Sequence, residues 1–88
     1  MKRYYIIYQG IVQGVGFRWR IIQIARKYGL SGYVRNCDNG TVACEVQGEQ
    51  TDAFLEESLR PDRFARVYDH SIKEIPLKTG EDGFTVRF

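Results

Sequence analysis

Two different spacings of apolar residues adjoin in the first third of the chain. Residues 4–12 are mostly aromatic and β-branched, a composition that predicts a strand. From Trp19 onward the apolar positions follow the i, i+3, i+4, i+7 spacing of an amphipathic helix. These positions are Ile21, Ile24, Ala25 and Tyr28. Gly29 stands where a helix C-terminal cap belongs, so we expect the helix to end there.

The middle of the chain combines a hairpin pattern with a second helical pattern. Residues 32–36 and 42–48 predict two strands, and the Asn-Gly dipeptide at 39–40 predicts a type I′ turn between them. We expect a second helix that is capped by Thr51 and bounded by Pro61. The apolar stripe of this helix consists of Phe54, Leu55 and Leu59.

The last third of the chain predicts a strand at 65–75, a loop at 76–83 and a short strand at 84–88. The predicted order is β-α-β-β-α-β, with an extra short strand at the end. This order is typical of the ferredoxin-like α+β sandwich, in which an antiparallel sheet packs two helices on one face. In this topology the first and third strands are central and the second lies at an edge. We expect a single domain over residues 1–88.

Length and charge limit the classes of function. A chain of 88 residues fits one domain with one modest core. The net charge is +2 and the basic residues are scattered, which does not favour nucleic-acid binding. No apolar run approaches the length of a membrane span, and the N-terminus lacks the pattern of a signal peptide. We expect a cytoplasmic monomer with neither a membrane nor a nucleic-acid partner.

The cysteines and the single histidine do not form a recognisable metal or catalytic motif. A structural metal site needs about four well-spaced ligands, so we predict that no metal is bound. Cys37 and Cys44 flank the predicted hairpin without being directly opposite each other, so we expect two free thiols. His70 lies in a strand pattern without a Ser or Cys partner, and we expect it to be structural or solvent-facing.

The segment Gln13–Arg18, QGVGFR, joins the first strand to the first helix. Gly14 and Gly16 allow positive φ angles and close approach of the backbone to a ligand, so successive N–H groups can converge on an anion. The helix N-terminus adds unpaired donors, and Arg18 adds a planar, permanently charged guanidinium. Together these groups indicate a site for a tetrahedral oxyanion, with phosphate the leading candidate.

A simple glycine-rich turn is the alternative interpretation of this segment. The segment is not a Walker A loop, because no Gly-Lys-Ser/Thr follows. It is not a dinucleotide fingerprint either, because Trp19 stands where the third glycine belongs.

Asn36, at the end of the second predicted strand, is the second candidate site residue. Its amide offers both a donor and an acceptor and can hold a water in a defined orientation. The alternative is that Asn36 simply begins the turn, as asparagine often does.

The stretches GIVQGVGFR and GYVRNCDNGTV resemble the acylphosphatase family. Its pattern is G-x-V-Q-G-V-x-F-R, then a helix, then G-x-V-x-N-x-x-x-G-x-V, and the chain matches every fixed position. The resemblance is most specific between Gly10 and Val42 and extends over the whole chain in length and element order. Tyr8, where the family often has Val, and the spacing around Arg60-Pro61 depart from the family in regions remote from these motifs.

The resemblance implies hydrolysis of acyl phosphates to a carboxylate and inorganic phosphate, with no metal or organic cofactor. Arg18 is then the catalytic residue that binds phosphate, and Asn36 orients the attacking water. The rest of the segment from Gln13 supplies the phosphate cradle, with backbone contributions from Gly14, Val15, Gly16 and Phe17.

The sequence leaves two alternative functions to consider, and the roles of Trp19 and Arg20 are not fixed by the motif. A non-catalytic module that binds acyl or carbamoyl phosphate is one alternative to the enzyme. An RNA-recognition domain would share the element order, but the third strand, TVACEVQ, lacks the aromatic residues that such domains use. For Trp19 we expect filling of the sheet–helix interface rather than cover of the loop, and for Arg20 a solvated helix face.

Overall fold

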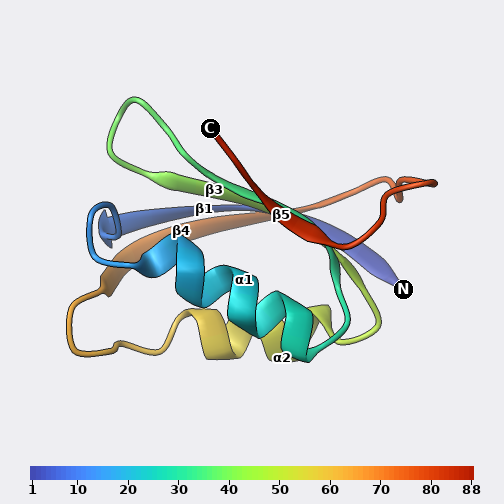
Figure 1. Ribbon diagram of the computed structural model, residues 1–88, viewed down its shortest axis with the longest axis horizontal. Helices are drawn as coiled ribbons and strands as arrows, with labels where there is room; N and C mark the ends of the chain where they lie inside the picture. The colour runs from blue at the N-terminus through green and yellow to red at the C-terminus, as the bar shows by residue number, and fades with distance from the viewer.

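Five strands form one sheet in the computed structural model, which describes residues 1–88 (Figure 1). The chain runs β1 (Lys2–Ile11), α1 (Phe17–Lys27), β2 (Ser31–Asn36), β3 (Val42–Gly48), α2 (Thr51–Ser58), β4 (Arg66–Ile75) and β5 (Phe84–Arg87). The strand order is β4-β1-β3-β2-β5. Both helices lie on one face, and neither is long and apolar enough to cross a membrane. The predicted ferredoxin-like α+β class is confirmed.

One edge of the sheet differs from the prediction, because β5 lies there. β1, β3, β2 and β4 pair antiparallel, and β1 and β3 are central as expected. β5, however, pairs in parallel with the outer side of β2. The expectation that the second strand lies at an edge is therefore wrong, because the loop after β4 returns the chain to the opposite edge of the sheet.

Two local predictions are also wrong. Asn39 does not have the positive φ that a type I′ turn requires, and only Gly40 does, at 88°. The amide of Gly40 donates to the carbonyl of Cys37, and the amide of Cys37 donates to the carbonyl of Thr41. The hairpin therefore has a three-residue loop that ends in a left-handed glycine. Thr51 does not cap α2 either: it is the first residue of the helix and is buried, and Gln50 holds the cap position.

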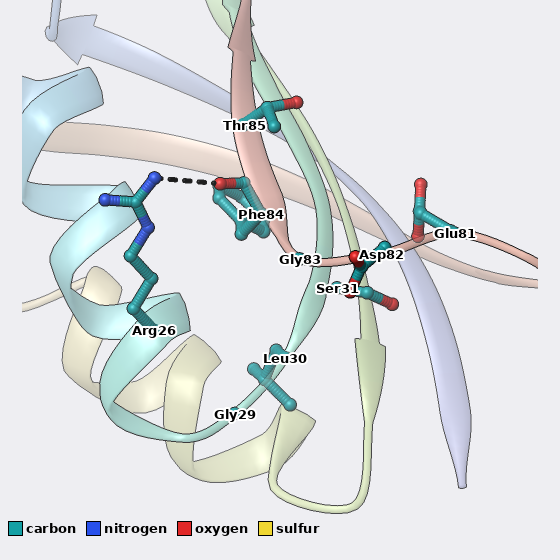
Figure 2. A pocket seen from close by; sticks show the side chains of 9 residues that line it. All are labelled: Arg26, Gly29, Leu30, Ser31, Glu81, Asp82, Gly83, Phe84 and Thr85. Carbon is teal, nitrogen blue, oxygen red and sulfur yellow. Dashed lines mark hydrogen bonds between the residues drawn. The ribbon is translucent and has the colours of Figure 1, made fainter.

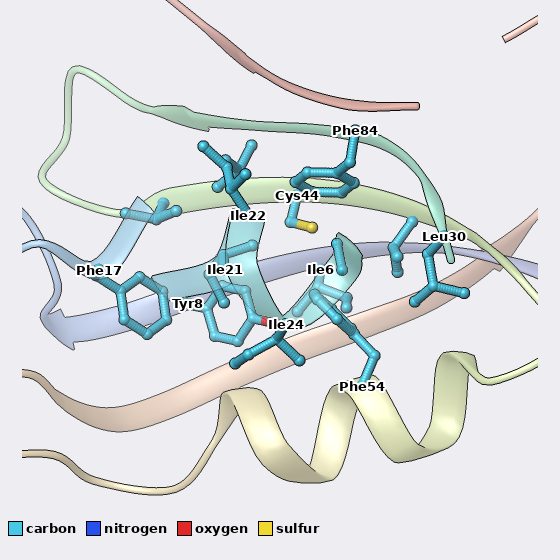
Figure 3. Close-up of a cluster of buried hydrophobic side chains, with 14 of the residues drawn as sticks. Ile6, Tyr8, Phe17, Ile21, Ile22, Ile24, Leu30, Cys44, Phe54 and Phe84 are labelled. Carbon is cyan, nitrogen blue, oxygen red and sulfur yellow. The ribbon is translucent and has the colours of Figure 1, made fainter. Parts of the chain in front are cut away.

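The core lies between the sheet and the two helices (Figure 3). Alternate residues of β1 point toward the helices, as do alternate residues of β3, because successive side chains of a strand face opposite sides. They meet the apolar stripe of α1 and Phe54 of α2. The main members of this cluster are Ile6, Tyr8, Phe17, Ile21, Ile24, Cys44, Val46, Phe54 and Phe84. Cys37 and Cys44 are both free, as predicted.

Tyr8 brings a hydroxyl into this core. Its ring is fully buried and makes an edge contact with Phe17, the first residue of α1, with 5.1 Å between the ring centroids. Ser58 donates its one proton to the carbonyl of Leu55 at 2.8 Å, so the hydroxyl of Tyr8 donates to the Ser58 oxygen at 2.7 Å. Burial raises the pKa of Tyr8 well above its usual value, which keeps this hydroxyl protonated. Tyr8 thus links β1 to both helices.

Arg3 organises the opposite face of the sheet. Its side chain is 1% exposed, and its guanidinium bonds Glu45 at 2.8 Å and, in bidentate fashion, Glu81 at 2.8 and 3.2 Å. The hydroxyl of Tyr33 donates to the other oxygen of Glu45 at 2.7 Å. Because Glu81 lies in the loop before β5, Arg3 fixes the connection that delivers β5 to the edge of β2.

Ser58→Ala is expected to destabilise the fold by about 1–3 kcal/mol, since it leaves the buried hydroxyl of Tyr8 without an acceptor. The double variant Tyr8→Phe/Ser58→Ala removes both partners and should recover most of this loss. The measurement is the free energy of unfolding in urea. The predicted role of this hydrogen bond would be contradicted if Ser58→Ala were as stable as the wild type, or if the double variant were no more stable than Ser58→Ala.

Glu81→Gln is expected to lower stability at pH 7 and to matter less in acid. The hydrogen bonds from Arg3 lower the pKa of Glu81. The ion pair of Glu81 therefore contributes fully to the free energy of unfolding above the unfolded-state pKa of this carboxyl, roughly 4.3. This contribution is lost as the pH falls through the lower pKa of the folded state. The difference in unfolding free energy between wild type and variant should shrink between pH 7 and roughly pH 2.5. An equal difference at both values would refute the predicted role of the ion pair.

Candidate active site

The loop between β1 and α1 has a backbone that only glycine adopts readily. Gly14 has φ 73° and Gly16, the N-cap of α1, has φ 79°. A Cβ atom at either position would meet no other atom within 4 Å. It is thus the left-handed backbone conformation, and not a lack of space, that requires glycine here.

The same loop presents unused backbone donors. The backbone hydrogen bonds outside helices and strands include none donated by Gly14, Val15 or Gly16. The first intrahelical bond of α1 runs from the amide of Arg20 to the carbonyl of Gly16, at 3.1 Å, so the three preceding helical amides have no partner within the helix. No acidic residue occupies this first turn. The partial positive charge of the helix N-terminus is therefore available to an anion.

Arg18 lies in the first turn of α1 and is partly exposed. Its guanidinium makes no hydrogen bond or ion pair with the protein and lies over the ring of Phe88, 5.4 Å from the ring centroid. The aromatic face supports the planar side chain and leaves its N–H donors free.

Asn36 reaches the site from the end of β2. Its side-chain amide oxygen is buried and accepts no hydrogen bond from the protein. A buried acceptor without a partner costs about 1–3 kcal/mol, so this oxygen favours any donor that can enter. A water molecule or a ligand hydroxyl is small enough to serve.

Gln13 connects these two parts of the site. Its side-chain nitrogen donates to the carbonyls of Cys37 and Thr41, both at 2.8 Å. Both protons of the side-chain amide are thereby directed to the β2–β3 hairpin, so Gln13 has only its backbone N–H left to donate to a ligand. This side chain thus ties the glycine loop to the hairpin that follows Asn36.

A cavity of about 180 Å³ lies where the loop, α1 and β2 meet. It is lined by Val12, Gly14, Gly16, Phe17, Arg18, Trp19 and Asn36. The structure thus brings together Gly14, Gly16, Phe17, Arg18 and Asn36 from the predicted site. Gln13 and Val15 do not line the cavity: Gln13 binds the hairpin, and Val15 packs against the core.

Trp19 and Arg20 differ from expectation. Trp19 is 64% exposed and does not fill the core. A helical-wheel argument predicts this, because Trp19 is roughly 200° around the helix from Phe17. Arg20 is only 20% exposed and is not on a solvated face: it donates to the carbonyls of Glu57 and Arg60 at the end of α2 and lies 3.6 Å from Asp62.

A larger cavity, of about 660 Å³, lies at the other end of α1 (Figure 2). It is lined by Arg26 and by residues 29–31 and 81–85. Two of its charged side chains already have partners, since Arg26 donates to the carbonyl of Phe84 at 3.4 Å and Glu81 binds Arg3. No buried polar atom in it lacks a hydrogen bond, in contrast to Asn36 in the smaller cavity. The smaller cavity is therefore the better candidate for chemistry.

The acidic, histidine and cysteine side chains do not form a metal site. No group of three or more His, Cys, Asp or Glu lies close enough together to hold a metal ion. His70 is exposed on β4, as the sequence predicts.

Comparison with known proteins gives a consistent result. A family model described as Acylphosphatase matches residues 4–86. An acylphosphatase of Clostridium acetobutylicum is 41% identical to this chain, in an alignment that covers 98% of this chain and 97% of that protein. The crystal structure of acylphosphatase from Bacillus subtilis is similar over 100% of both chains, with a TM-score of 0.93 and 34% identity. The chain is also similar to 12% of the T. kodakarensis HypF structure, with a TM-score of 0.84 and 36% identity.

Gln13→Ala is expected to loosen the hairpin against the glycine loop. Loss of two hydrogen bonds should lower the unfolding free energy by about 1–2 kcal/mol. It should also speed hydrogen exchange at the hairpin amides of Cys37 and Gly40. Gln9→Ala, at an exposed position in β1, is the matched control. Unchanged exchange at both hairpin amides in Gln13→Ala would show that the link is unimportant.

Proposed function

The chain belongs to the acylphosphatase family, and we propose that it hydrolyses acyl phosphates to a carboxylate and inorganic phosphate by means of Arg18, Asn36 and the Gln13–Arg18 loop. The observation that best supports this proposal is the small cavity itself. It combines unused N–H donors, a free guanidinium and an unpartnered amide oxygen, from two separate segments of the chain.

The phosphoryl group would lie in the cradle of the loop. The amides of residues 14–17 and the helix N-terminus donate to its oxygens, and Arg18 adds two parallel donors and a full positive charge. Gln13 contributes mainly by holding the loop in place, since its side chain binds the hairpin. Phosphoryl transfer depends largely on such positioning and on stabilisation of the equatorial oxygens.

Asn36 would orient the nucleophile. A water that donates one hydrogen bond to its buried amide oxygen is held at the wall of the cavity, with a lone pair free to attack phosphorus. As the new P–O bond forms, the bond between phosphorus and the acyl oxygen breaks, and the electron pair leaves with the carboxylate. A phosphoryl oxygen of the substrate takes the proton of the water.

This scheme requires no protein general base. A carboxylate is a good leaving group, so bond breaking can run ahead of bond formation and the water needs little activation. The cavity lining agrees with this, since none of its side chains is a His, Asp, Glu or Lys.

A phosphate-binding module without turnover is the second candidate. The chain is also similar to 12% of HypF, a much longer protein whose structure has been solved in a phosphate- and nucleotide-bound form. Both candidates use the same cradle, and they differ in whether bound acyl phosphate is released as phosphate.

Arg18→Ala and Asn36→Ala are each expected to lower kcat for benzoyl phosphate by about 10²–10³-fold, the typical effect of removing one preorganised donor or positioning group. Arg18→Lys should recover only part of the loss, because lysine lacks the planar fork. The measurement is phosphate release under saturating substrate, with folding verified by circular dichroism.

Arg35→Ala is the matched control. It removes the same charge one residue from Asn36, at an exposed position whose side chain faces away from the core. Its activity should stay within about twofold of wild type. If Arg18→Ala and Asn36→Ala also retain full activity, the mechanism is wrong. If the wild type binds benzoyl phosphate without releasing phosphate, the binding module is the correct function.

A further inference from the structure

Trp19 is the one exposed side chain that gives the small cavity an apolar wall. Val12 and Phe17 also line it, but each is 1% exposed and belongs to the core, whereas Trp19 is 64% exposed. A ligand that covers this indole would remove a large apolar area from water, which favours binding. Its position beside Arg18 and the glycine loop suggests a ligand that shares their site.

The size of the cavity limits which part of a substrate it can enclose. Pockets that enclose whole drug-sized ligands are roughly 300–1,000 Å³, whereas this one is about 180 Å³. With the phosphoryl group on the loop amides and Arg18, the acyl group must project out of the cavity. Trp19, two residues after Phe17 in α1, lines the side of the cavity from which the acyl group would project.

On the basis of the proposed function, we propose that the indole of Trp19 binds the acyl group of the substrate and makes this protein selective for acyl phosphates with a planar aromatic or extended apolar acyl group. A benzoyl ring can stack against the indole in an offset or edge arrangement. An acetyl or carbamoyl group is too small to cover it. The loop would thus provide recognition of phosphate and Trp19 would provide recognition of the acyl class.

Other exposed aromatic residues do not have this position. Phe64 and Tyr68 are 63% and 72% exposed, but neither lines the cavity. The ring of Phe88 is already occupied by the guanidinium of Arg18. Phe64 therefore serves as a control of nearly equal exposure to Trp19.

Unreactive analogues test the contact directly, since Trp19 is the only tryptophan of the chain. Phenacylphosphonate and acetonylphosphonate replace the bridging oxygen of benzoyl and acetyl phosphate by a methylene group. Phenacylphosphonate should change the tryptophan fluorescence strongly, and inorganic phosphate should change it little. By calorimetry, phenacylphosphonate should bind wild type roughly tenfold more tightly than acetonylphosphonate, and Trp19→Ala should abolish this preference.

Kinetics provide the second test. Trp19→Ala should lower kcat/KM for benzoyl phosphate roughly tenfold, mainly through KM, and that for acetyl phosphate only about twofold. Trp19→Phe should fall between wild type and Trp19→Ala, while Phe64→Ala should match wild type on both substrates. An equal loss on both substrates in Trp19→Ala, or an unchanged preference, would overturn the role of Trp19. Failure of the wild type to hydrolyse either substrate would instead overturn the proposed function, and the fluorescence titration would still report whether the indole meets the ligand.

Discussion

The pair of hydrogen bonds from the side chain of Gln13 to the β2–β3 hairpin is the interaction on which the site depends. The glycine loop follows β1, and Asn36 ends β2, which is not adjacent to β1 in the sheet. Within the sheet, β1 and β2 are joined only through β3, where Val42 pairs with both Tyr8 and Asn36, and the glycine loop extends beyond the end of β1. Gln13 uses both protons of its side-chain amide to join the glycine loop to this hairpin, and so holds the loop amides close to Asn36.

The fold supports this arrangement from both faces of the sheet. On the helical face, Tyr8 contacts Phe17 at the start of α1 and bonds Ser58 of α2, so the helix N-terminus that bears Arg18 is held against the sheet. On the other face, Arg3 binds Glu81 and thereby fixes the loop before β5. β5 is followed by Phe88, whose ring supports the guanidinium of Arg18. Residues far from the cavity thus determine where its charged group lies.

The phosphate-binding loop and Trp19 have different roles in the proposed function. In the proposed mechanism, Arg18 and the loop amides would bind the phosphoryl group that every acyl phosphate has, whereas Trp19 would contact the acyl group, in which these molecules differ. The small volume of the cavity is consistent with both roles, because a site that encloses only the phosphoryl group would leave the acyl group at the surface.

Local sequence was enough to predict most of the elements and several site residues. Alternation and helical spacing reflect burial on one face, so they predicted the strands, both helices and the ferredoxin-like class. Positive φ angles are a local property of glycine, so Gly14 and Gly16 could be assigned to a cradle beside Arg18, and Asn36 could be singled out at the end of its strand. What only the tertiary structure decided is which groups meet. Gln13 bonds residues 24 and 28 positions away, β5 pairs with β2 across the sheet, and Arg20 binds the end of α2. The exposure of Trp19 could be inferred from its position on the helix, but its position beside the cavity could not. Such contacts depend on how the elements pack, and no local pattern encodes them.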